Sequence, residues 1–200
     1  MSKQRSVNRY RVIDLAIFAV LTTVFEYLIV KASSGLFRQE YWVVSLTCAM
    51  TCIVYMRWGV WGCIHAVLGG VVWCAANGTA GRQLPGWCFY IIYGAGNVLS
   101  LAVVPLMKKI GKEEIRKSKW KKIFIALFTQ LLMHIGRVII AFLCGVPAGE
   151  LLSFFTTDAL SYVFTALVVF AASAADGVYE DQLHYLKRLQ KEEALKGEDL

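Results

Sequence analysis

The sequence predicts an all-α, polytopic membrane protein, a bundle of six transmembrane helices with the N- and C-termini inside. Two observations predict this class. Hydrophobic residues make up 58% of the 200-residue chain and charged residues only 18%, a balance outside the usual range of soluble globular domains. The apolar residues also gather into six runs that approach the roughly 20 residues needed to cross a bilayer. These runs are residues 12–30, 41–56, 59–77, 87–107, 123–144 and 151–175.

The runs divide the chain into a basic N-terminus, residues 1–11, a membrane domain, residues 12–175, and a polar tail, residues 176–200. The first run contains Asp14 and Glu26, so we expect it to stay in the protein as a helix rather than be cleaved as a signal peptide.

The second and third runs are separated only by Arg57 and Trp58, which predicts an antiparallel helical hairpin. In the third run Gly62, Ala66 and Gly70 recur at every fourth position. Small residues at this spacing allow a neighbouring helix to approach closely, so we expect this face to pack inside the bundle.

The last part of the chain predicts an amphipathic helix. Leu183, Leu186 and Leu189 recur at helical spacing among charged residues in the tail. We expect this helix to lie in the cytoplasm, on the lipid surface or against a partner.

The Lys and Arg residues predict the orientation in the membrane. With the N-terminus inside, 17 of the 21 fall on the cytoplasmic side, three fall outside, and Arg137 lies within a predicted helix. Cytoplasmic loops carry an excess of these residues, so an even number of spans with both termini in the cytoplasm is expected.

Polar residues inside the runs give the main functional signal, because an ionisable group costs roughly 2.5–3.5 kcal/mol in the middle of a membrane helix. Gln130, His134 and Arg137 share one stripe of the fifth predicted helix. The sixth helix runs the other way and brings Asp158 to a similar depth, where it can pair with Arg137. We expect these groups to ring a cavity that opens outward. The alternative is a buried network that only holds the helices together.

Further groups are expected at the same level. Glu26 lies near the outer end of the first run and Asn97 near the middle of the fourth, and aromatic side chains of the fourth run could form stacking walls. The predicted substrate-binding residues are Glu26, Asn97, His134, Arg137, Thr157, Asp158, Trp87 and Tyr93.

No motif predicts catalysis. The chain has no His-Glu-x-x-His, Gly-x-Ser-x-Gly or phosphate-binding glycine loop, and a hydrolase built on His134 and Asp158 would lack a marked nucleophile. The six cysteines lie in apolar runs, where cysteine packs as a small hydrophobe. Basic residues are not interleaved with aromatic ones on a polar surface, as nucleic-acid binding requires. We therefore expect no enzymatic activity, no metal or cofactor and no nucleic-acid partner.

Several short phrases resemble one family of membrane proteins. They are Arg57-Trp58-Gly59, the run from Thr156 to Ser161, Asp176-Gly177 and Glu180-Asp181-Gln182. Together with six short helices, internal termini and a polar pocket near the outer surface, they look like the substrate-binding S components of energy-coupling factor (ECF) vitamin transporters, in an uncharacterised bacterial branch. The resemblance spans nearly the whole chain.

The resemblance implies a function and partners. Many S components carry Ala-x-x-x-Ala on the first helix as a docking face, and this chain has Ala16, Ala19 and Thr23 on or near one face. It implies capture of a vitamin-like or nucleobase-like small molecule from outside a bacterial cell membrane. A transmembrane coupling subunit and two cytoplasmic ATPases would be the partners.

Two other functions stay open. A stand-alone proton-coupled carrier would use His134 and Asp158 as its relay. A non-transport membrane scaffold would recruit a partner through the basic loop, residues 108–122, and the tail.

Overall fold

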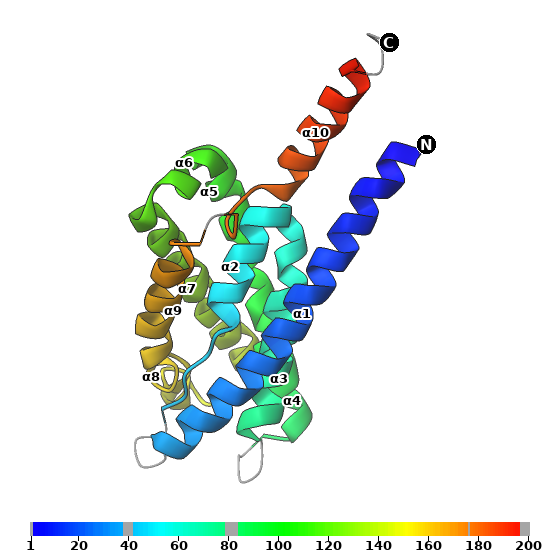
Figure 1. The fold of residues 1–200 in the computed structure, drawn as a ribbon. Helices are drawn as coiled ribbons and strands as arrows, with labels where there is room; N and C mark the ends of the chain where they lie inside the picture. The colour runs from blue at the N-terminus through cyan, green and yellow to red at the C-terminus, as the bar shows by residue number, and fades with distance from the viewer. Residues whose placement is uncertain (1, 38–41, 79–83, 176, 197–200) are drawn as a thin grey trace.

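The computed structural model describes residues 2–37, 42–78, 84–175 and 177–196, and every regular element in these ranges is helical (Figure 1). In chain order the elements, with 3-10 helices marked η, are α1 (Ser2–Leu36), α2 (Thr47–Trp58), η1 (Gly59–Trp61), α3 (Gly62–Asn77), α4 (Gly86–Gly96), η2 (Asn97–Ala102), α5 (Val103–Ile110), α6 (Lys112–Lys117), α7 (Lys119–Leu143), η3 (Ala148–Glu150), α8 (Ser153–Thr156), α9 (Ala159–Ala172) and α10 (Gln182–Lys196). The prediction of an all-α fold is confirmed for these ranges.

Five helical stretches are long and apolar enough to cross a membrane. They are Val7–Leu36, Thr47–Asn77, Gly86–Ile110, Lys119–Leu143 and Ala148–Ala172. They support the predicted class of a helical membrane protein, because each exceeds the length that a bilayer core requires. The finer prediction of six crossings depends on the second stretch, which is folded back on itself.

That second stretch is the predicted hairpin. Gly59 has a positive φ of 62°, a backbone conformation that glycine adopts readily, and the chain reverses there. The Tyr55 ring lies against Gly62, and the Thr47 side chain lies against Gly69, so α2 and α3 run antiparallel in close contact. The third predicted helix thus packs its small residues inside the bundle, as expected.

Helix α1 is longer than predicted and lies at the edge of the bundle (Figure 1). It begins at Ser2, so the basic N-terminal residues continue the helix instead of preceding it. Only one stripe faces the other helices, and large apolar side chains such as Val20, which is 62% exposed, point outward. Apolar side chains exposed along a whole helix suit contact with lipid or with a membrane partner.

Helix α2 starts later than its hydropathy predicts. The run was expected from residue 41, but Tyr41 lies outside the described residues and the helix begins only at Thr47. Residues 42–46 are not helical. The Val43 N–H donates to the Thr157 carbonyl at 2.9 Å, and the Val44 N–H donates to Ser33 Oγ at 2.9 Å. These bonds satisfy backbone groups that a helix would otherwise pair internally.

Two other predicted helices are interrupted. The run predicted at 87–107 is split by the 3-10 segment η2, just before Pro105. Proline has no N–H to bond the carbonyl four residues earlier, which favours a break in the α-helical pattern at this point. The run predicted at 151–175 is split between α8 and α9, where the Ser161 N–H bonds to the Asp158 carbonyl and leaves the Thr157 carbonyl for Val43.

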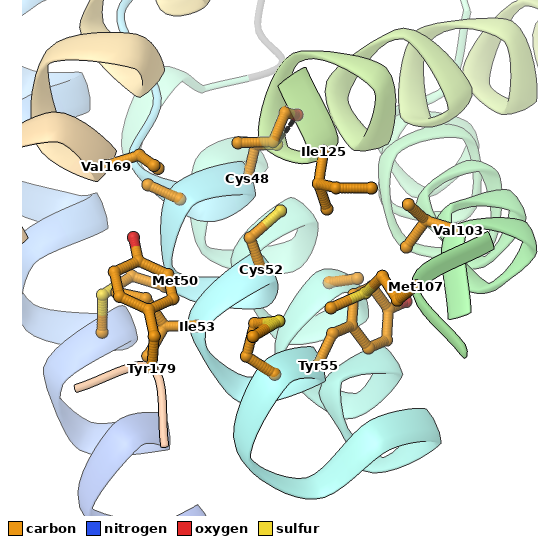
Figure 2. Packing of buried hydrophobic residues seen from close by; sticks show 14 of the residues in the cluster. Cys48, Met50, Cys52, Ile53, Tyr55, Val103, Met107, Ile125, Val169 and Tyr179 are labelled. Carbon is orange, nitrogen blue, oxygen red and sulfur yellow. Dashed lines mark hydrogen bonds between the residues drawn. The ribbon is translucent and has the colours of Figure 1, made fainter. Parts of the chain in front are cut away.

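The apolar core centres on α2, whose residues Thr47–Met56 are all buried. Figure 2 shows Cys48, Cys52 and Tyr55 of this helix facing Ile125 of α7 and Met107 of α5. A second apolar cluster, which includes Val30, Trp73 and Ala141, packs nearer the end where α1 finishes. Helix α2 is thus the central element around which the others pack.

Helix α10 and the first turns of α1 project from the same end of the bundle (Figure 1). At this end Arg57 pairs with Asp14 through two bonds of 2.7 and 2.8 Å and also donates to the Gly177 carbonyl. Lys112 pairs with Asp181 at 3.0 Å. These contacts attach the segment after α9 to α1, α2 and α6.

Candidate functional site

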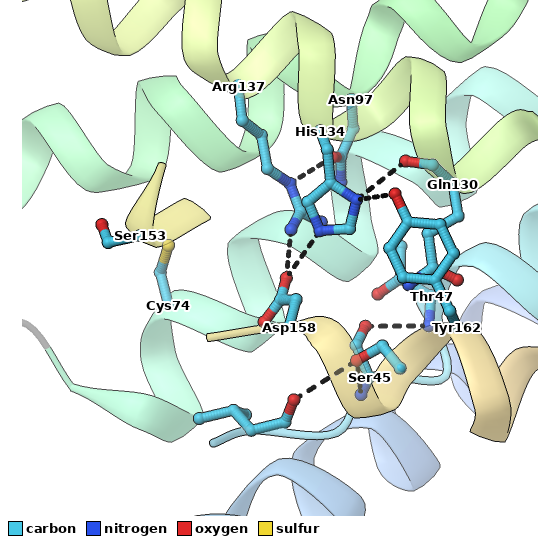
Figure 3. A network of polar contacts seen from close by, with 12 residues as sticks. Ser45, Thr47, Cys74, Asn97, Gln130, His134, Arg137, Ser153, Asp158 and Tyr162 are labelled. Carbon is cyan, nitrogen blue, oxygen red and sulfur yellow. Dashed lines mark hydrogen bonds and ion pairs between the residues drawn. The ribbon is translucent and has the colours of Figure 1, made fainter. Parts of the chain in front are cut away.

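Four polar side chains converge inside the membrane-spanning part of the bundle, and we call them the polar cluster: Asn97, His134, Arg137 and Asp158. Figure 3 shows them pointing toward one another. All are buried, with at most 3% of each residue exposed. Helix α7 supplies His134 and Arg137 from an unbroken helix, whereas Asn97 opens η2 and Asp158 precedes α9. Two of the four therefore sit at helix interruptions, as in transporters whose broken helices form the solute site.

Arg137 is the centre of the polar cluster. Its Nε–H donates to Asn97 Oδ1 at 2.8 Å, and its Nη1 group forms an ion pair with Asp158 Oδ2. The guanidinium also lies over the Tyr93 ring, 4.5 Å from the centroid. Asn97 in turn donates to the Ala66 carbonyl at 2.7 Å, so α3, η2, α7 and the start of α9 are joined through one arginine.

His134 connects the polar cluster to α9. Its Nε2 lies 3.4 Å from Asp158 Oδ2. Its Nδ1 lies 3.0 Å from both the Gln130 carbonyl and the Tyr162 hydroxyl, and the Tyr162 ring stacks on the imidazole. With its amide oriented by its neighbours, Gln130 donates to Thr165 Oγ1 at 2.8 Å. The polar stripe predicted on the fifth helix thus faces α9 along its length.

Asp158 holds an unusual position for its residue type. It immediately precedes α9, where an aspartate commonly caps the helix with its own carboxylate, yet its side chain makes no such bond. Oδ2 instead faces Arg137 and His134, and Oδ1 is buried with no hydrogen-bond partner among the described residues. A buried carboxylate oxygen without a partner is costly, which marks this atom as a place where a ligand could donate.

Glu26 is not part of the polar cluster but binds the residues at the beginning of α2. Its Oε1 accepts from the Ser45 hydroxyl at 2.7 Å and its Oε2 from the Leu46 N–H at 2.6 Å. The carboxylate is fully buried and caps the beginning of α2, where a negative charge is favourable. Ser45 also donates its N–H to Ser161 Oγ at 2.9 Å, which links Glu26 to the first turn of α9.

Aromatic rings surround the polar cluster. Tyr93 stacks on Trp73 with 4.0 Å between ring centroids, and Phe154 lies 6.0 Å from Tyr93 in a tilted arrangement. Phe155 lies 5.3 Å from the His134 ring. Both phenylalanines belong to α8, so this short helix covers the polar cluster.

The predicted site residues therefore fall into two groups. Asn97, His134, Arg137 and Asp158 meet as expected, Tyr93 lies beneath the arginine, and Glu26 is connected through Ser45 and Ser161. The Thr157 hydroxyl makes no contact with these side chains among the described interactions, although the Thr157 carbonyl holds Val43. Trp87 is 64% exposed in the first turn of α4, and none of the described contacts joins it to the polar cluster.

The cavity expected to open outward is closed in this structure. Arg137 and Asp158 are in direct contact, and His134 and Asp158 are each only 1% exposed. The reason is that opposite charges in a region of low dielectric attract strongly, and the α8 phenylalanines exclude water from them. A solute could reach these groups only if the elements around them separated.

Three hydroxyl-bearing residues of the site were not among the predicted substrate-binding residues: Ser45, Ser161 and Tyr162. Tyr162 lies one helical turn after Asp158, and that spacing on a helix carrying a buried charge could have identified it. Ser45 and Ser161 gave no comparable signal, since they interact across the non-helical segment that hydropathy did not reveal.

The predicted docking residues lie on the open side of α1. Ala16 and Thr23 are exposed, and Ala19 is half-buried. Large apolar side chains flank them, and Ile17 and Val20 are 53% and 62% exposed. This face is available to lipid or to another membrane protein.

The chain matches no family model, no curated protein and no solved structure.

Proposed function

We propose that this protein is the substrate-binding S component of an ECF-type importer, which captures a vitamin-like or nucleobase-like small molecule from outside the cell. The observation that carries the proposal is the polar cluster, built from three separate helical segments, two of them interrupted at its level. A structural ion pair needs only two residues, whereas this cluster adds a histidine, an amide and an unpartnered carboxylate oxygen.

In this proposal the observed arrangement is the closed state. The segment of residues 148–157 covers the polar cluster through Phe154 and Phe155, and Leu152 on the same segment is 72% exposed. Movement of this segment would expose Asp158 and Arg137 to the outside. The solute would then reach the unpartnered Oδ1 of Asp158 and the groups around it.

The proposal includes an orientation. Both α10 and the start of α1 lie at one end of the bundle, together with α6 and the basic residues 108–122 around it, so this end is assigned to the cytoplasm. Helices α2 and α3 are each taken as one crossing, which gives six. The membrane is a bacterial plasma membrane.

The proposal also includes partners. The exposed face of α1 around Ala16, Ala19 and Thr23 would dock a transmembrane coupling subunit, and two cytoplasmic ATPases would supply the energy. Small side chains on a smooth helix let a second helix approach closely within lipid.

The deciding experiment is ligand-dependent thermal stabilisation of the purified full chain across a panel of vitamins and nucleobases. We expect at least one compound to raise the Tm of the wild type and to lose that effect in Arg137→Ala. The matched control is Arg57→Ala, which removes a half-buried arginine from an ion pair at the opposite end and should keep the response. If no compound raises the Tm of the wild type, or if both variants respond alike, capture at the polar cluster is wrong.

The contact between His134 and Asp158, 3.4 Å apart, favours a second candidate, the stand-alone proton-coupled carrier. Reconstituted liposomes separate the two functions. A proton-coupled carrier moves solute with this chain alone, driven by a proton gradient across the liposome membrane. An S component requires its coupling subunit and ATPases. A scaffold would give neither transport nor ligand stabilisation.

A further inference from the structure

Asp158 is the carboxylate of the polar cluster that lies in direct contact with a cation. Arg137 pairs with Asp158, whereas Glu26 accepts from the Ser45 hydroxyl and the Leu46 N–H, beyond the link between Ser45 and Ser161. His134 is the remaining titratable group in direct contact and carries charge only when protonated. With His134 neutral, Arg137 is the one charged partner of Asp158 among the described residues.

The two oxygens of Asp158 are also unequal. Oδ2 faces both Arg137 and His134, while Oδ1 is buried and accepts nothing from the described residues. His134 Nε2 likewise has no hydrogen-bond partner among the described residues, although it lies 3.4 Å from Oδ2. An acceptor oxygen and an adjacent ring nitrogen are therefore left together in a buried place.

The cost of binding at this site differs between an anionic and a cationic solute. An anionic solute must take Arg137 from Asp158 and would leave that carboxylate buried without its charge partner, which is strongly unfavourable. A cationic N–H donor can bond Oδ1 while the Arg137 pair stays intact.

The surrounding rings indicate the shape of such a solute. Phe155 and Tyr162 flank His134, and Phe154 packs beside Tyr93. Aromatic faces attract cations and stack on planar groups. A flat, delocalised cation would use both the rings and the carboxylate.

We propose that the captured solute is a planar organic cation with N–H donors, of the amidinium or protonated aminopyrimidine class, and that it donates to Asp158 Oδ1. This inference rests on the proposed function, because it assigns the charge of the solute that the same site would bind.

Three probes of the same size test the charge: benzamidinium, benzamide and benzoate. We expect benzamidinium to raise the Tm of the full chain, while the neutral and anionic probes do not. In Asp158→Asn the apparent affinity for benzamidinium should fall roughly 10- to 100-fold, the loss expected for a charge-assisted hydrogen bond. Asp14→Asn, which alters a carboxylate paired with Arg57 at the other end, should keep the wild-type affinity.

The outcomes separate this inference from the proposed function. Stabilisation by benzoate, or by benzamide as strongly as by benzamidinium, overturns the cation assignment. The cation assignment is also overturned if an uncharged or anionic vitamin raises the Tm of the wild type and loses that effect in Arg137→Ala. In that case the capture of a solute at the polar cluster would still stand. If neither the probes nor any vitamin changes the Tm, both are wrong. Should Asp158→Asn fail to fold, Asp158→Glu serves instead, because it keeps a carboxylate but moves it. We then expect benzamidinium still to be preferred among the three probes, with a weaker affinity than for the wild type.

Discussion

At the residue scale, the pair of Arg137 and Asp158 is the most consequential contact in the molecule. Both side chains are almost completely buried, so each depends on the other for charge neutralisation. Removing one partner of a buried ion pair leaves an uncompensated charge, whereas replacing both with apolar groups can be nearly neutral. A double variant can therefore keep the fold and show separately whether the pair is needed for ligand binding.

We expect Arg137→Leu and Asp158→Ala each to lower the free energy of unfolding by about 3–5 kcal/mol. The double variant Arg137→Leu/Asp158→Ala should recover most of that loss, because no buried charge is left alone in it. Denaturant unfolding in detergent micelles measures the three values.

The same double variant should fold but show no ligand stabilisation under the capture proposal. A double variant that is both stable and fully responsive to ligand would show that the pair only holds helices together. If the double variant is less stable than both single variants, the cost of burying the charges has been overestimated.

Charged residues of the site could be predicted from the sequence, but hydroxyl residues could not. Arg137 and Asp158 have no inexpensive position in hydrocarbon, so their presence within apolar runs indicated a pair. A hydroxyl can bond to its own helix, as Thr129 does with the Ile125 carbonyl and Ser173 with the Val169 carbonyl. Ser45 and Ser161 therefore could not be distinguished in advance from residues of that kind.

At the element scale, the contact of α4 with α7 positions the polar cluster. A Cβ atom added to Gly136 would lie 2.0 Å from the Gly96 carbonyl oxygen, and one added to Gly96 would lie 2.7 Å from the Arg137 backbone. The two helices thus touch through their backbones immediately beside Asn97 and Arg137.

We expect Gly136→Ala and Gly96→Ala each to cost about 1–3 kcal/mol or more, because rigid backbone atoms would have to move apart. Gly94→Ala is the control, since its added Cβ would have no neighbour nearer than 3.7 Å. That change should be neutral or stabilise by about 0.5–1 kcal/mol, as expected for alanine in a helix. Equal losses of Tm in all three variants would contradict the backbone contact.

Hydropathy located the helices but not their interruptions. The predicted runs match the apolar stretches because the bilayer sets both length and composition. The break at Thr157 depends on a hydrogen bond from Val43, more than a hundred residues away in sequence, and the late start of α2 depends on Glu26. A local average of hydropathy detects neither the Val43 bond nor the Glu26 bond, because each joins residues that are distant in the sequence.

At the scale of the whole molecule, the hairpin of α2 and α3 decides the topology. If each arm crosses the membrane, the chain has six crossings and both termini share one side. If the hairpin instead entered and left the membrane on one side without crossing it, the count would be four, and the η1 turn would no longer reach the cytoplasm.

We expect Val60→Cys, in the η1 turn, to react with an impermeant thiol reagent only after cells are permeabilised, and Leu152→Cys to react in intact cells. Both positions are well exposed, at 56% and 72%. A tag after residue 200 should behave like Val60→Cys. The unmodified chain, with its six native cysteines, gives the background labelling. Reaction of both variants from the same side would exclude the six-crossing arrangement.

The capping of α2 by Glu26 has a consequence for biosynthesis. Glu26 is synthesised 19 residues before Ser45 and 20 residues before Leu46, the residues whose hydroxyl and N–H will donate to its carboxylate. While the ribosome is still adding those residues, α1 carries an acidic group with nothing to neutralise it in lipid. We therefore expect α1 to wait in the translocation channel and to leave it together with α2, as a pair rather than one helix at a time.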